Sequence, residues 1–259
     1  MKQVIIYISM IVVAFLMIFI IKYNEAKQPI KIYFVNTYYS YVLDEEETID
    51  IMFFINHDYP ILDTNNYMDV KIYNEDQSKQ MTLSALEINL MGSESYLGET
   101  YEKYMLELQM PQINQSFYID DAILEITLTN DDIYQFYFGT LSLFYSEQSE
   151  VNIIDWQSLS AIKDAETSIS RIKEIYVAFN EINQTIDEIY IGANHQVNWT
   201  INDDKLILTI DYDKQLLYAC PIMIYNDQGD IQIIDYFLYI NDYQILKESG
   251  MMLYGYLLS

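Results

Sequence analysis

The first thirty residues divide into an apolar run and a polar segment. Residues 4–21 carry no charge, and Ser9 is the one small polar side chain among them. As a helix this run would be about 27 Å long, close to the hydrocarbon thickness of a bilayer. We therefore predict a short N-terminal segment (1–3), a transmembrane helix (4–21) and a polar stalk (22–29). The membrane-spanning residues would include Val4, Ile11, Phe15 and Ile21.

The apolar run has the features of a retained signal anchor. It is longer than the apolar region of about 7–15 residues in a cleavable signal, and no small-x-small site follows it. A long domain is translocated with little regard to flanking charge. We expect a single-pass protein of the cell membrane that contacts the bilayer through residues 4–21. Its N-terminus would be cytoplasmic and the bulk of the chain would lie outside.

From Ile30 onward the apolar positions alternate as in β-strands. Residues 48–56 place Ile49, Ile51, Phe53 and Ile55 on one face. Residues 122–129 and 133–145 alternate in the same way around the turn-forming 130–132, which predicts a hairpin. The number and spacing of such runs predict a β-sandwich of immunoglobulin-like size over residues 30–146.

The second half is also mostly β. A polar linker (147–157) precedes a second β-sandwich-like domain (158–259). Two hairpins are expected, the first around residues 202–205 and the second around 226–230, where Gly229 can take the positive φ of a tight turn. A short helix is predicted at the start of this domain, since Ser158 can cap a run with helical spacing. That run has its apolar residues at Ile162, Ala165, Ile169 and Ile172.

The charge of the chain excludes one class of ligand. The sequence has 39 acidic and 13 basic residues, a net charge of -26. Duplex nucleic acid is excluded because binding it needs clustered Lys and Arg. The single Cys220 excludes an internal disulfide, and two histidines cannot fill a structural zinc site. We expect no cofactor.

Acidic pairs recur at the predicted turns. Asp120-Asp121, Asp131-Asp132 and Asp203-Asp204 are the main examples. Carboxylate-rich loops can bind Ca²⁺, but Asp is also a favoured turn residue. We interpret these pairs as turn residues, with a calcium- or carbohydrate-binding β module as the alternative function.

The sequence lacks the established catalytic motifs. It has no Gly-x-Ser-x-Gly elbow, no His-Glu-x-x-His helix and no phosphate loop. Ser160 and Lys163 have the spacing of a serine–lysine pair, but the companion motifs of such enzymes are missing. Cys220 lies in an apolar run, which indicates a buried, inert thiol. We predict that the protein is not an enzyme; an envelope hydrolase using two carboxylates is the alternative.

Tyrosine supplies the strongest indication of binding. The chain has 26 tyrosines, a residue type enriched at protein interfaces. Tyr38, Tyr39, Tyr41, Tyr134 and Tyr137 are the candidate partner-binding residues, although strand tyrosines also fill cores. The sequence thus predicts a non-enzymatic accessory subunit that binds a membrane or envelope protein.

Overall fold

The structure is a computed structural model. It describes residues 11–17, 29–42, 48–145, 151–163, 172–210, 215–218, 220–237, 245–248 and 252–258.

Only seven residues of the predicted anchor fall within these ranges. Residues 11–17 form a helix in which Ile11 and Phe15 are exposed, and Val4 and Ile21 lie outside the described residues. No helix among the described residues is both long enough and apolar enough to cross a membrane.

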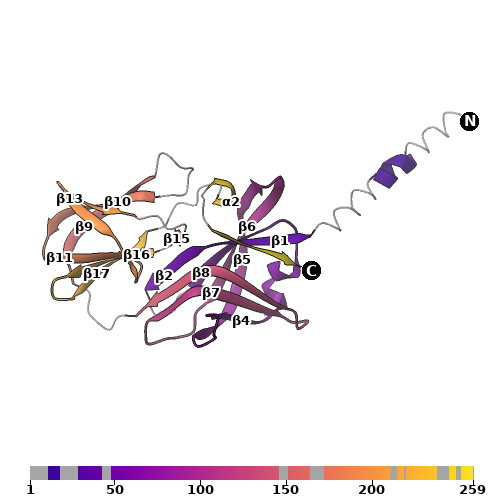
Figure 1. The fold of residues 1–259 in the computed structure, drawn as a ribbon, viewed down its shortest axis with the longest axis horizontal. Helices are drawn as coiled ribbons and strands as arrows, with labels where there is room; N and C mark the ends of the chain where they lie inside the picture. Colours follow the sequence, from indigo (N-terminus) through magenta and orange to yellow (C-terminus); the bar gives the residue numbers. More distant parts are fainter. Residues whose placement is uncertain are drawn as a thin grey trace, which may run out of the picture.

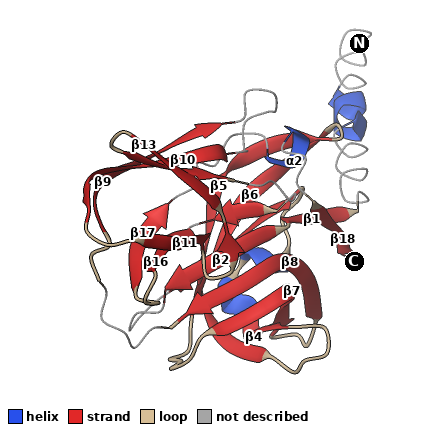
Figure 2. Ribbon diagram, turned by 60° about the vertical axis from the view of Figure 1, so that its left-hand side comes forward, coloured by secondary structure: helices blue, strands red, loops and turns tan. Residues whose placement is uncertain are grey.

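The rest of the described chain is almost entirely β-sheet, which confirms the mostly β prediction (Figures 1 and 2). The first half contains β1 (Ile30–Val35), β2 (Thr37–Val42), β3 (Thr48–Ile55), η1 (Pro60–Leu62), η2 (Thr64–Asn66), β4 (Tyr67–Tyr73), β5 (Gln80–Tyr96), β6 (Glu99–Gln109), β7 (Phe117–Leu128) and β8 (Ile133–Phe144). The second half contains β9 (Ile154–Lys163), β10 (Ile172–Ile182), β11 (Ile186–Ile191), β12 (His195–Gln196), β13 (Asn198–Asn202), β14 (Lys205–Thr209), β15 (Leu216–Tyr218), β16 (Cys220–Asn226), β17 (Ile231–Phe237), α2 (Ile245–Glu248) and β18 (Leu253–Leu258).

Ten strands form one sheet in the order β15-β2-β8-β7-β4-β5-β6-β3-β1-β18. The long strand β5 makes this possible because it belongs to both halves of the sheet. Its first residues pair with β4, as far as Leu83, and its remainder, from Ser84 to Tyr96, pairs with β6. The sheet therefore wraps as a half-barrel around one core, in which Phe34, Phe136 and Phe138 are among the largest buried side chains.

The chain changes from one half of this sheet to the other between β1 and β2. β1 is antiparallel to β3, whereas β2 is parallel to β8. Gly139 in β8 has φ +126°, and a Cβ atom there would lie 2.0 Å from the carbonyl oxygen of Thr37. A glycine is needed because the two backbones approach so closely.

The C-terminal strands return to the first half of the chain. β15 is parallel to β2, and β18 is antiparallel to β1. The C-terminus consequently lies beside the start of β1 (Figure 1). The sequence pattern places residues 158–259 in one separate domain, whereas Tyr218, Leu246 and Leu258 pack into the first core. Local alternation cannot show this, because the partners of β18 are more than 200 residues away.

The second unit is a sandwich of two four-stranded sheets, β13-β14-β10-β9 and β12-β11-β16-β17. Ile175, Leu208 and Ile222 are fully buried between them. Both predicted hairpins are confirmed, with Asp203 at φ 54° in the first turn and Gly229 at φ 84° in the second.

The predicted helix at Ser158 is wrong over the described residues. Residues 154–163 form β9, which is antiparallel to β10. Leu159 and Ala161 pack against the second core, while Ser158 is exposed on the other side of the strand. The alternating burial of side chains along β9 therefore decides its structure, despite the helical spacing of the apolar residues in this run. Ala165 and Ile169 lie outside the described residues.

Candidate interaction surface

Tyr38, Tyr39 and Tyr41 are buried, so they are not available to a partner in this structure. The hydroxyl oxygen of Tyr39 accepts a hydrogen bond from the backbone N–H of Met52 at 3.0 Å, and that of Tyr41 accepts one from Asp50 at 3.1 Å. Burial raises the pKa of both phenols well above the ordinary value, so both remain neutral.

These two hydrogen bonds form because the chain passes from one half of the sheet to the other between β1 and β2. β1 pairs with β3 only as far as Phe53, because the chain then leaves for the other half of the sheet. No strand among the described residues therefore pairs with the next N–H groups on that edge of β3. The hydroxyl groups of Tyr39 and Tyr41 take the place of such a strand, which explains why two tyrosines occur at i and i+2 in β2.

Tyr38 points to the opposite side of β2, into the second core. Its hydroxyl accepts a hydrogen bond from the N–H of Asn194, and Ser40 accepts one from Ala193. Burial raises the pKa of Tyr38 to about 12. A Cβ atom on Gly192 would lie 2.5 Å from the Tyr38 ring. β2 thus holds the two units together, and its tyrosines have a structural role.

Tyr134 and Tyr137 are half-buried and stay candidates for partner contact. The hydroxyl of Tyr134 lies 2.8 Å from that of Tyr59. The Tyr137 ring lies 5.8 Å from the ring of Tyr254. Both are supported by other aromatic residues, which fixes their orientation on the surface.

The distal part of β5, residues 84–96, carries three exposed apolar side chains. From Ser84 onward β5 pairs with β6 alone, and no other backbone hydrogen bond to this stretch is found among the described residues. Leu86, Leu90 and Met91 are 45%, 58% and 50% exposed. An edge strand of this kind presents unpaired backbone groups together with apolar side chains. Alternation along the sequence does not identify such an edge, because a strand edge is a property of topology.

Two irregularities shape this edge. The register of β5 against β6 shifts between Ala85 and Glu87 and again between Leu90 and Gly92. Leu86 and Met91 are the extra residues at these bulges. A bulge re-aims a side chain, so both apolar groups are turned outward. The end of the β5–β6 hairpin that contains Glu94 lies beside α2 (Figure 1).

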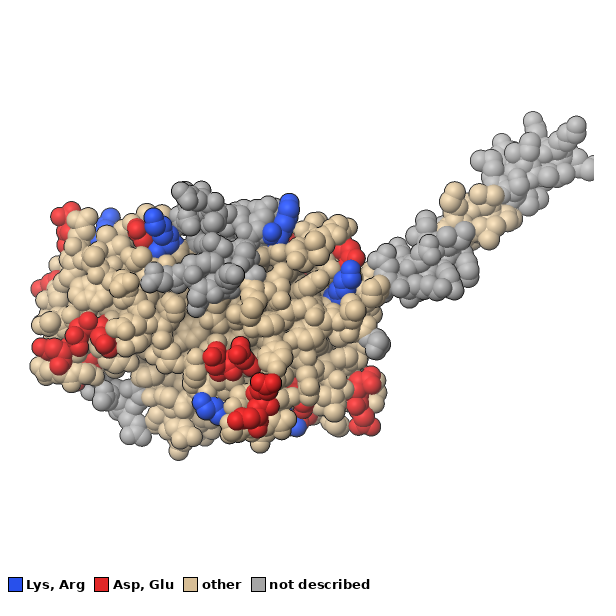
Figure 3. All heavy atoms as spheres, in the orientation of Figure 1, with Lys and Arg blue, Asp and Glu red and all other residues tan. Residues whose placement is uncertain are grey.

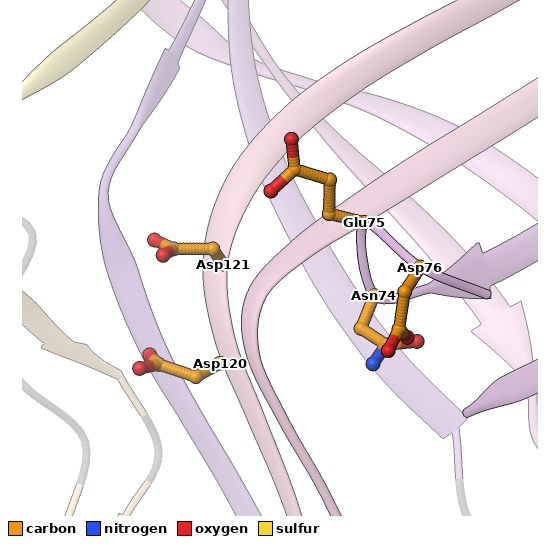
Figure 4. A pocket seen from close by; sticks show the side chains of 5 residues that line it. All are labelled: Asn74, Glu75, Asp76, Asp120 and Asp121. Atoms are coloured by element: carbon orange, nitrogen blue, oxygen red, sulfur yellow. The ribbon is translucent and has the colours of Figure 1, made fainter. Parts of the chain in front are cut away.

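An acidic depression lies at the other end of β5. Asn74, Glu75, Asp76, Asp120 and Asp121 line it. Acidic side chains gather on this face (Figure 3). Asp120 and Asp121 project in one direction from a bulge in β7, where Asp121 has φ 48° (Figure 4). Asp76 accepts a hydrogen bond from the N–H of Ser78, and hydrogen bonds from this turn lower its pKa. No cluster of three or more His, Cys, Asp or Glu residues suited to a metal ion occurs within the described ranges.

Cys220 is confirmed as a buried thiol. It is fully enclosed in the second core, and burial raises its pKa to about 12. At neutral pH the thiolate form is therefore scarce, and the residue lacks the exposure that a nucleophile needs.

No protein-family model matches the sequence, and no curated protein sequence matches it. One similar solved structure is titled "Structures of Clostridium thermocellum CbhA fibronectin(III)-like modules". The match has 8% sequence identity and a TM-score of 0.18, and it covers 79% of this chain and 90% of the other. The class of this chain, a mostly β protein with a half-barrel and a β-sandwich, follows from its own strand pairing.

Proposed function

We propose that this chain is a membrane-anchored, non-enzymatic protein that lies mostly outside the cell membrane. In this proposal it is an accessory subunit that binds another protein of the membrane or envelope. Support for the anchor comes from the uncharged run over residues 4–21. Support for protein binding comes from the edge of β5.

The observation that carries the binding proposal combines a strand edge that has no backbone partner among the described residues with three exposed apolar side chains. An extended segment of a partner can add to such an edge, and its backbone hydrogen bonds then supply affinity. Leu86, Leu90 and Met91 would supply apolar contacts beside the added strand. The strand between the bulges, residues 87–90, is regular and suits a short added strand.

Charge defines the chemistry of the partner. The chain has a net charge of -26, so a strongly acidic partner would be repelled. The distal part of β5 carries only Glu87 and the buried Glu94 as acids and has no basic residue. We therefore expect an apolar, neutral or basic segment to add at this edge.

Lysine substitution at the edge tests the proposal. The variant carries Leu86→Lys and Leu90→Lys; the matched control is Ile201→Lys on β13, where the side chain is 46% exposed. Full burial of a leucine is worth about 1.5–3 kcal/mol, so two half-exposed leucines contribute about 2 kcal/mol, or about 30-fold in affinity.

The measurement is quantitative mass spectrometry of proteins that co-purify with the full chain after mild detergent extraction. A membrane or envelope protein should be recovered stoichiometrically with the wild type and the control, and lost from the double-lysine variant. Equal recovery with all three chains would remove β5 as the binding edge. Recovery of no companion would contradict the accessory role itself.

A further inference from the structure

The end of the first unit at which β1 begins carries the two most exposed apolar side chains of its strands and turns. Leu97 in the β5–β6 turn is 79% exposed, and Leu257 in β18 is 70% exposed. Leu257 lies opposite Lys31 in the β1–β18 ladder. Lys31 in turn forms an ion pair with Glu99, two residues beyond Leu97, at 2.6 Å. Both leucines therefore flank one ion pair.

The hairpin tip reaches beyond the neighbouring strand. Pairing of β3 with β6 ends at Ile55 and Glu102, while β5 and β6 remain paired to Tyr96 and Glu99. The turn at Leu97 is thus several residues past the end of β3. It projects at the same end as the start of β1.

Aromatic rings surround this end. The ring of Tyr33 lies 5.5 Å from that of Tyr96 and 5.3 Å from that of Tyr101. Tyr101 is buried, whereas Tyr33 and Tyr96 are half-buried. Tyrosine is enriched at membrane–water interfaces, where its amphipathic ring lies at the level of the headgroups.

One ion pair, Lys31 with Glu99, lies at this end. Glu99 accepts hydrogen bonds from Lys31, Tyr101 and Asn56, and these contacts lower its pKa. The ion pair is close to neutral as a unit. Elsewhere the chain is strongly acidic, and anionic lipid would repel it within a Debye length of about 8 Å. The neutral ion pair and the two exposed leucines let this end approach a bilayer with less repulsion than a purely acidic surface would meet.

The chain connectivity brings this end near the proposed anchor. Residues 22–29 are the eight residues between the apolar run and Ile30. Fully extended they span at most about 28 Å, and any compaction brings β1 closer to the bilayer. We infer that the end formed by Leu97, Leu257, Tyr33 and Tyr96, the apolar end, rests on the lipid surface from which the anchor emerges. This inference depends on the proposed anchoring and adds an orientation to it.

Site-directed fluorescence of the full chain tests the inference. The chain is placed in phosphatidylcholine nanodiscs that contain a phosphatidylcholine with a nitroxide on its headgroup. Leu97→Cys and, separately, Leu257→Cys carry an environment-sensitive fluorophore. The matched control is Ile201→Cys on β13, which lies on the side of the molecule away from β1 (Figure 1). Cys220 is buried and does not compete for the label.

We expect the emission at both leucine sites to shift to the blue and to be lost to nitroxide quenching. The label at Ile201 should show neither effect. A chain that incorporates into discs but gives equal emission at all three sites would overturn this inference and leave the anchoring intact. A chain that elutes without lipid would overturn the anchoring and this inference together.

Discussion

Replacement of Tyr39 by phenylalanine tests the role of the β2 tyrosines. Tyr39→Phe keeps the buried ring and removes only the hydroxyl that accepts the hydrogen bond from the Met52 N–H. That N–H would then be buried without a partner, which costs about 1–3 kcal/mol. For a chain of this size, a loss of about 2 kcal/mol lowers the Tm by about 4–8 °C.

The assay is thermal unfolding of the full chain in a mild detergent, followed by far-ultraviolet circular dichroism. Fluorescence of Trp156 and Trp199 follows the second unit separately, since both tryptophans lie there. Tyr176→Phe is the control. Among the described residues the Tyr176 hydroxyl donates a hydrogen bond only to the side chain of Glu174, so we expect no change in the Tm of this variant. If Tyr39→Phe melts at the wild-type temperature, the hydroxyl does not replace a missing strand, and the structural role assigned to the β2 tyrosines is wrong.

Two further predictions concern close packing and pH. In urea unfolding, Gly139→Ala should lower the stability of the chain far more than Gly98→Ala. Both glycines have positive φ, but only at Gly139 does the added Cβ meet the backbone of Thr37. Equal losses of stability would show that backbone strain alone decides the effect. Burial raises the pKa of Glu94, so its stability contribution is complete below about pH 4.5 and declines as the pH rises through the raised pKa. The stability of Glu94→Gln relative to wild type should therefore increase between pH 4.5 and 8, and a pH-independent difference would contradict this.

The elements that the sequence predicts well are those with local causes. The β7–β8 and β13–β14 hairpins follow from alternation that is interrupted by Asp and Asn, and Asp131 and Asp203 do adopt positive φ in these turns. The inert thiol at Cys220 follows in the same way from its apolar surroundings. In each case the deciding information lies within about ten residues.

The elements that escape prediction depend on distant partners. The pairing of β18 with β1 and of β15 with β2 has no signature in either strand taken alone. The burial of Tyr39 likewise follows from where β1 stops pairing with β3. The polar hydroxyl of a strand tyrosine favours a position at the surface, whereas the Tyr39 hydroxyl completes an interrupted sheet edge inside the protein.

The placement of β2 has a consequence for how the two units behave. Tyr39 and Tyr41 enter the first core from one side of β2, while Tyr38 enters the second core from the other. β15 pairs with β2 at the edge of the ten-stranded sheet, and Gly192 of the second unit packs directly on Tyr38. The two units are therefore joined through one shared strand in addition to the linker. A chain anchored at its N-terminus would transmit the orientation of β1 through Asn36 into β2 and so into both cores. Contact of the apolar end with lipid would then fix the direction in which β5 and the second unit face a partner.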